Sequence, residues 1–127
     1  MLMAAWFVLL AAAAWLGWAG WCMAFRPASA LQLLSRTATT SRINAIEQVP
    51  RLIAGAAMMV RAEVARFPDF FTIAGGFIVA TSVVLLIVPL QWHNGYAVFW
   101  AKRVPLPAVR LIAPLSVLGG IGLIWAA

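Results

Sequence analysis

The sequence is poor in the side chains that carry most protein chemistry. Its 127 residues include one cysteine, one histidine and three acidic residues. The single cysteine, Cys22, excludes an intramolecular disulfide and a cysteine-based metal cluster. It lies inside an apolar run, where a buried structural thiol is the expected role. No phosphate-binding glycine loop is present, because the two Gly-Gly pairs, at 75–76 and 119–120, lie within apolar stretches.

The scarcity of carboxylates argues against catalysis. Glu47, Glu63 and Asp69 all lie among arginines, where ion pairing explains them better than acid/base chemistry. His93 is the one residue able to ligate a haem- or chlorophyll-type metal, but a surface histidine in an aromatic belt is the interpretation we favour. We therefore expect no enzymatic activity, no cofactor and no metal. A lipid-modifying activity at an arginine-rich interface is the enzymatic alternative.

Apolar residues, in contrast, are abundant. Hydrophobic residues make up 65% of the chain and charged residues 9%, against averages of about a half and about a quarter in soluble domains. A soluble fold of this length has too little interior to bury so much apolar surface. The composition predicts an all-α integral membrane protein with a single membrane domain over residues 1–127.

Three long apolar runs are predicted to cross the membrane, at about 3–25, 70–90 and 107–126. The central run has no charge, and a helix of this length covers roughly 30 Å, the thickness of the hydrocarbon core. The first run has a signal-peptide alternative, because Ala28-Ser29-Ala30 resembles a cleavage site. A retained helix is favoured, since the run is long and lacks a basic n-region.

The stretch from 43 to 67 has a different pattern. Apolar residues recur every three or four positions, and the apolar segment between Arg51 and Arg61 is too short to span. The sequence therefore predicts an amphipathic interfacial helix between the first and second spans, a soluble helix packed on a partner being the alternative. The residues predicted to contact lipid headgroups are Arg42, Arg51, Arg61 and Arg66.

The segment at about 91–104 is predicted to be an outer aromatic segment at the headgroup layer. Its four aromatic side chains share one helical face: Trp92, Tyr96, Phe99 and Trp100.

Charge counting predicts the orientation. The connection over residues 26–69 carries six arginines against three acidic residues, and the connection over 91–110 carries three basic residues. The excess of basic residues predicts that the first connection is cytoplasmic. With three spans, the N-terminus is expected outside and the C-terminus in the cytoplasm, in the cell inner membrane. Because the basic residues flank apolar runs, nucleic acid is not an expected partner.

Small residues suggest how the spans associate. Glycine, alanine and serine at helical spacing allow close approach of another helix. The expected partners are membrane lipids and other transmembrane helices. We expect a non-catalytic accessory or scaffold subunit that associates laterally with itself or a larger complex, an oligomeric channel or small-solute transporter being the alternative. The predicted packing positions are Ala13, Gly17, Gly20, Gly76, Ala80, Ser116 and Gly120.

Overall fold

A computed structural model describes residues 1–36 and 39–127. In these residues the fold is helical and has no strand, as predicted. Three helices are long and apolar enough to cross a membrane, and they are the three expected ones: α1, α4 and α6. The elements are α1 (Leu2–Phe25), α2 (Pro27–Ser35), α3 (Ser41–Arg61), the 3₁₀ helix η1 (Ala62–Val64), α4 (Pro68–Ile87), α5 (Leu90–Arg103) and α6 (Leu106–Ala126).

Prolines and one threonine define many of the helix boundaries. Pro27 and Pro68 occupy the first positions of α2 and α4, where a missing N–H costs nothing. Thr40 caps α3, its Oγ1 accepting a 3.1 Å hydrogen bond from the N–H of Ile43. Pro89 follows the extended residue Val88 and separates α4 from α5.

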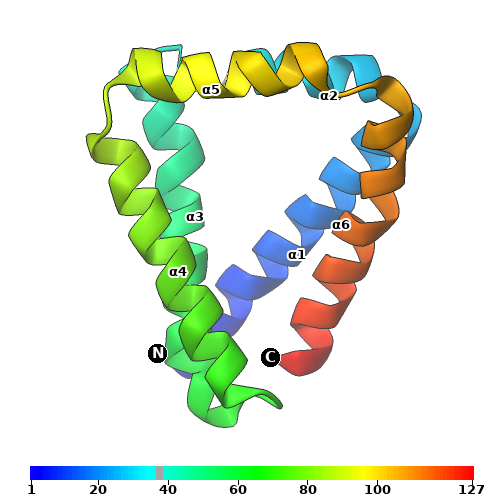
Figure 1. The fold of residues 1–127 in the computed structure, drawn as a ribbon. Helices are drawn as coiled ribbons and strands as arrows, with labels where there is room; N and C mark the ends of the chain where they lie inside the picture. Colours follow the sequence, from blue (N-terminus) through cyan, green and yellow to red (C-terminus); the bar gives the residue numbers. More distant parts are fainter. Residues whose placement is uncertain (37–38) are drawn as a thin grey trace.

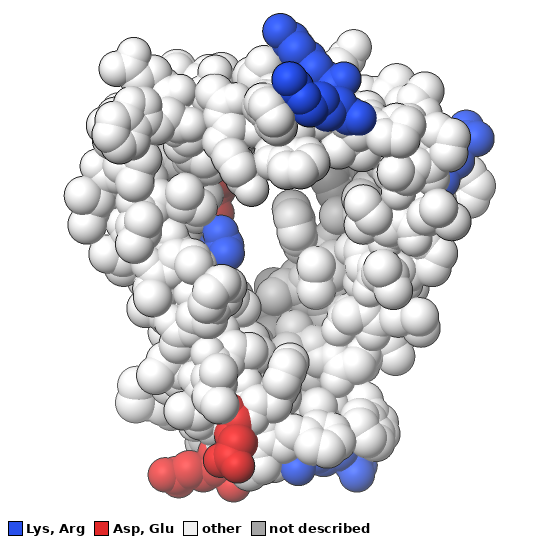
Figure 2. Space-filling model, viewed as in Figure 1, with Lys and Arg blue, Asp and Glu red and all other residues white. Residues whose placement is uncertain are grey.

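The long helices form two antiparallel pairs. α1 packs against α6, and α3 packs against α4. The pairs approach each other at the end that holds both chain termini and spread apart at the other end, where α2 and α5 cross between them (Figure 1). In the space-filling view an opening remains between the pairs (Figure 2). We call it the central opening.

The apolar core lies at the end where the pairs converge. Leu9 of α1 and Phe71 of α4 are completely buried there. Most of the other buried members are small, which lets four helices approach closely. The core consists of Ala5, Leu9, Ala57, Met58, Ala62, Ala65, Phe71 and Ala126.

Arg61 ties both ends of the chain to this core. Its Nη1 donates to the carbonyl of Leu2 at 3.0 Å, and its Nη2 donates to that of Ala127 at 2.7 Å. Both termini therefore lie at the same end of the molecule (Figure 1). The expected orientation, with the N-terminus outside and the C-terminus in the cytoplasm, stays a prediction.

The expected interfacial position of the 43–67 segment is not confirmed. α3 ends at Arg61 and packs lengthwise on α4 instead of crossing its end. Four long helices consequently run between the two ends of the molecule, and α3 carries Glu47 and Arg51 near its middle. The apolar residues Ile46, Val49 and Ile53 of α3 are exposed, whereas its polar residues Asn44 and Gln48 are buried.

Some of the predicted packing positions lie at close helix contacts within the molecule. In the α1–α6 pair, a Cβ added at Gly20 or Gly120 would come within 2.9 Å of a backbone oxygen. Ser116 Oγ donates to the carbonyl of Leu16 at 2.7 Å. Gly17 and Gly76, in contrast, have no atom within 4 Å of an added Cβ.

The α3–α4 pair uses two glycines that the sequence did not single out. A Cβ added at Gly75 would lie 2.6 Å from the carbonyl oxygen of Gly55, and the reverse distance is 2.9 Å. Ala80, part of the predicted motif with Gly76, is exposed. The two helices therefore meet through Gly55 and Gly75.

We expect Gly75→Ala to destabilise the α3–α4 pair, because its methyl group would overlap a backbone oxygen that has no alternative position. Overpacking of this kind costs about 1–3 kcal/mol. Gly76→Ala is the matched control, since its methyl enters open space and alanine favours helix. Denaturation of both variants in detergent, followed by circular dichroism, compares their free energies of unfolding. Equal stability of the two variants would contradict the close contact at Gly75.

Candidate functional site

Several polar side chains of α3 are buried between the helices. Asn44 is 3% exposed and Gln48 5% exposed, and Ser82 of α4 has no exposed surface. His93 of α5 is also buried. Burying such groups is costly unless they are hydrogen-bonded. Arg51 and Thr81 are hydrogen-bonded to each other and belong to the same helices. We call these six residues the polar cluster: Asn44, Gln48, Arg51, Thr81, Ser82 and His93.

Asn44 joins three helices. Its Nδ2 donates to the carbonyl of Leu85 at 3.1 Å, and its Oδ1 lies 3.0 Å from Nδ1 of His93. The carbonyl of Leu85 needs this donor because its helical partner four residues later would be Pro89, which has no N–H. The Asn44 amide therefore replaces the hydrogen bond that α4 loses at its last turn.

The Asn44 contacts determine the protonation pattern of His93. Because Nδ2 of Asn44 is the donor to Leu85, Oδ1 is left as an acceptor, so the hydrogen of the neutral imidazole is on Nδ1. Burial lowers the pKa of His93 below its ordinary value of 6.5, and the positive charge of Arg51 lowers it further. The neutral ring, with an unprotonated Nε2, is the form that this environment favours.

Arg51 lies in the middle of α3 and is half-buried. Its Nη2 donates to Oγ1 of Thr81 at 2.9 Å. The Thr81 hydroxyl lies near the carbonyls of Phe77 and Ile78, at 2.9 and 3.1 Å, within its own helix. Figure 2 shows basic and acidic atoms on the α3–α4 side of the central opening.

Two atoms of the cluster have unused hydrogen-bonding capacity. Gln48 Oε1 and Ser82 Oγ are buried and have no partner among the described residues. The antiparallel pairing of Asn44 with Leu85 and of Arg51 with Thr81 puts these two side chains at the same level. Unpaired buried groups cost about 1–3 kcal/mol each. The cluster is thus partly a structural network and partly a set of unsatisfied polar atoms.

The four arginines predicted to contact headgroups differ in environment. Arg42 is exposed. Arg51 donates a hydrogen bond to Thr81, and Arg61 donates hydrogen bonds at the chain ends. Nε of Arg66 donates to the carbonyl of Trp125 at 3.0 Å, and its guanidinium lies 4.6 Å from the Trp125 ring centre. Headgroup contact by these residues stays a prediction.

The histidine interpretation needs a correction, since His93 is buried at a helix junction and is not a surface residue of an aromatic belt. Among the described residues, no group of three or more histidine, cysteine or acidic side chains is placed to hold a metal. Sequence reasoning missed Asn44 and Gln48. Their signal was a polar stripe, because Asn44, Gln48 and Arg51 follow at i, i+4 and i+7 on one face of α3.

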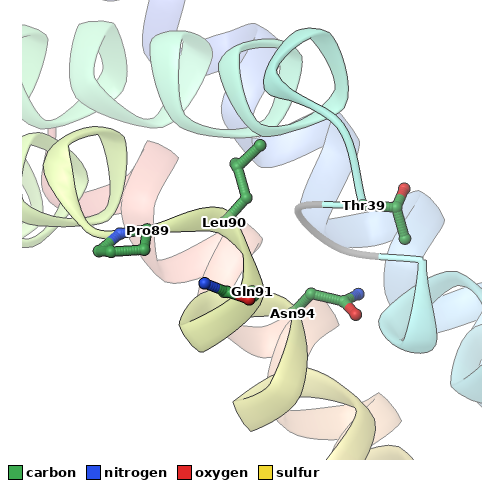
Figure 3. Close-up of a pocket in the computed structure, with 5 residues that line it drawn as sticks. All are labelled: Thr39, Pro89, Leu90, Gln91 and Asn94. Carbon is green, nitrogen blue, oxygen red and sulfur yellow. The ribbon is translucent and has the colours of Figure 1, made fainter.

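A shallow pocket of about 500 Å³ lies beside the cluster, at the α2–α5 end. Figure 3 shows Gln91 and Asn94 on the first turns of α5, with Thr39 opposite Asn94. Asn94 Nδ2 donates to the carbonyl of Ser35 at 3.1 Å and so connects α5 to the last turn of α2. The pocket lining has no charged residue: Thr39, Pro89, Leu90, Gln91 and Asn94.

No family model, curated protein or solved structure matches this chain.

Lowering the pH should destabilise the fold through the contact between His93 and Asn44. Because its pKa is lower in the folded protein than in the unfolded chain, the unfolded chain binds more protons between the two values. The stability that His93 contributes is complete above pH 6.5 and is lost as the pH falls below it. We expect the unfolding midpoint in detergent to decrease between about pH 7.5 and about pH 5.5. His93→Asn keeps a donor for Asn44 but does not titrate, so this variant should show a flatter pH dependence. An unchanged pH dependence in this variant would contradict the role of His93.

Proposed function

We propose that this chain is a multi-pass membrane protein of the cell inner membrane, without catalytic activity of its own. In this proposal it acts as an accessory or scaffold subunit that associates laterally with itself or with a larger membrane complex. Three apolar helices of sufficient length support the membrane location. The observation that carries the lateral association is the presence of glycines on outward faces of these helices.

The glycines of the apolar helices fall into two groups. Gly20, Gly75 and Gly120 lie at close contacts within the molecule. The second group has no atom within 4 Å of an added Cβ and consists of Gly17, Gly76, Gly119 and Gly122. A helical glycine costs about 1 kcal/mol relative to alanine, and these positions gain no contact within the monomer in return. A partner helix approaching these faces would use the space that the missing side chains leave.

An apolar groove supports the same proposal. It has a volume of about 410 Å³ and lies between α1 and α6. Small residues form part of its floor, so another helix or a lipid chain could approach the backbone there. The groove is lined by Leu10, Ala13, Ala14, Gly17, Val117, Gly120, Ile121 and Ile124.

The association is tested at Gly76. We expect Gly76→Leu to reduce association in native membranes at least about tenfold, because a large side chain would hold a partner helix away from the Gly76–Ala80 face. Gly76→Ala is the control that keeps the residue small. Blue-native electrophoresis and crosslinking measure the assembled fraction of each variant. A monomeric wild-type protein that crosslinks to no neighbour would refute lateral association.

A channel or small-solute transporter is the second candidate. Arg51 lies among the long helices, bonded to α4 and beside the titratable His93. Ionisable residues among transmembrane helices commonly mark solute pathways. Solute uptake by reconstituted vesicles that is lost in Arg51→Gln would support this candidate, and inert vesicles would count against it.

We also propose that α3 crosses the membrane with α1, α4 and α6, in place of lying in the interface. Its lengthwise packing on α4 supports this, as do its bonds to Leu85 and Thr81. Four crossings would leave both termini on one side of the membrane.

Charge segregation supports an orientation for this arrangement. Exposed basic residues gather towards the α2–α5 end, whereas basic and acidic residues are mixed at the end with the termini (Figure 2). The positive-inside bias favours a cytoplasmic α2–α5 end and external termini. The first group consists of Arg26, Arg36, Arg42, Lys102, Arg103 and Arg110; the mixed group is Arg61, Glu63, Arg66 and Asp69.

Reporter insertions test the topology. We expect reporters in the α2–α3 connection and in the α5–α6 connection to report the cytoplasm, and reporters at both termini to report the exterior. The physical reason is that Asn44 and His93 are hydrogen-bonded and so lie at one end of the frame. Opposite compartments for the two connections would refute four crossings and restore an interfacial α3.

A further inference from the structure

α5 has a buried side and an aromatic exposed side. His93 and Ala97 face the rest of the molecule and are buried, whereas Trp92 and Tyr96 are 69% and 68% exposed. Phe99 and Trp100 are each 45% exposed. α5 crosses the end of the two helix pairs instead of running along them (Figure 1). α5 therefore has the position of an interfacial helix.

Basic side chains accompany this aromatic face. Arg36, Arg42 and Lys102 are exposed and make no side-chain hydrogen bond to any described residue. Arg103 Nη1 donates to the carbonyl of Phe99 at 3.3 Å, and its guanidinium lies 3.6 Å from the Phe99 ring centre. Most donors of these four side chains are thus available. We call them, with the four aromatic residues of α5, the α5 surface.

The opposite end also exposes aromatic side chains, among them Phe70 and Trp125, but its basic groups are engaged within the molecule. The guanidinium groups of Arg61 and Arg66 bond to backbone carbonyls near the chain ends. Glu63 and Asp69 are exposed at the same end. Their negative charge offsets that of the arginines, so an anionic ligand gains less there.

We propose that the α5 surface binds the headgroups of anionic phospholipids in the surrounding bilayer. Guanidinium and ammonium groups complement lipid phosphates. Exposed tryptophan and tyrosine are enriched at the depth of the headgroups. The combination favours a lipid over a soluble acidic segment, because a soluble partner explains the charges but not the row of aromatic side chains. This inference does not depend on lateral association.

The test compares lipid selectivity in the full-length protein. Native mass spectrometry of the protein in mixed micelles measures bound phosphatidylglycerol relative to phosphatidylcholine. We expect wild-type protein to prefer phosphatidylglycerol, and the preference to fall as salt screens the charges. In the fourfold variant R36Q/R42Q/K102Q/R103Q, the preference for phosphatidylglycerol should be at least about tenfold smaller. R36K/R42K/R103K, which keeps the charges, should retain it.

Arg66→Gln is the comparison at the opposite end. Because Arg66 is bonded to Trp125 and lies near Glu63 and Asp69, we expect it to lower the preference much less than the fourfold variant does. Thermal unfolding of each variant in neutral lipid separates loss of lipid binding from loss of fold. Retained selectivity in the folded fourfold variant would overturn the proposal, as would an equal loss in Arg66→Gln. Binding of polyglutamate as tight as that of phosphatidylglycerol would also overturn it, since the surface would then be a docking site for an acidic protein segment.

Discussion

A helix ends in carbonyl groups that have no partner within the helix, and in apolar surroundings each of them needs a donor from elsewhere. In this chain the donors come from distant elements. Asn44 supplies Leu85, and Asn94 supplies Ser35. Arg66 and Arg61 supply Trp125 and Ala127. Each of these contacts joins two different parts of the chain. The hydrogen bonds that satisfy the helix ends therefore also hold the helices together.

This constraint explains why α3 is polar although it packs along an apolar helix. The core at the end with the termini needs small apolar residues, and α3 provides Ala57 and Met58 there. Towards the other end the two pairs spread apart, and hydrogen bonds from Asn44 and Arg51 add to the packing of α3 on α4. The polar residues of α3 thus lie where the two pairs no longer contact each other.

The sequence predicted the features of the fold that depend on run length and composition. It did not predict the features that depend on contacts between residues far apart in the chain. The three apolar helices follow from runs of about 20 apolar residues. The position of α3 does not, because the partner of Arg51 is Thr81, 30 residues away. On α4 the glycine that contacts α3 is Gly75 and not its neighbour Gly76, since neighbouring positions on a helix point about 100° apart. Gly75 meets Gly55, while an added Cβ at Gly76 has no atom within 4 Å. The number of crossings depends on where α3 lies, which run length and composition do not decide.

The polar cluster separates into groups whose role is structural and groups that the fold leaves unsatisfied. Asn44 is explained by its two bonds and Thr81 by its contacts within α4 and with Arg51. Gln48 Oε1 and Ser82 Oγ lie between these contacts and have no partner among the described residues, at a cost of about 1–3 kcal/mol each. The Gly55–Gly75 contact has no such cost and lies nearer the core. The two halves of the α3–α4 pair are therefore held differently: close backbone contact holds the half near the core, and hydrogen bonds from Asn44 and Arg51 hold the half near α5.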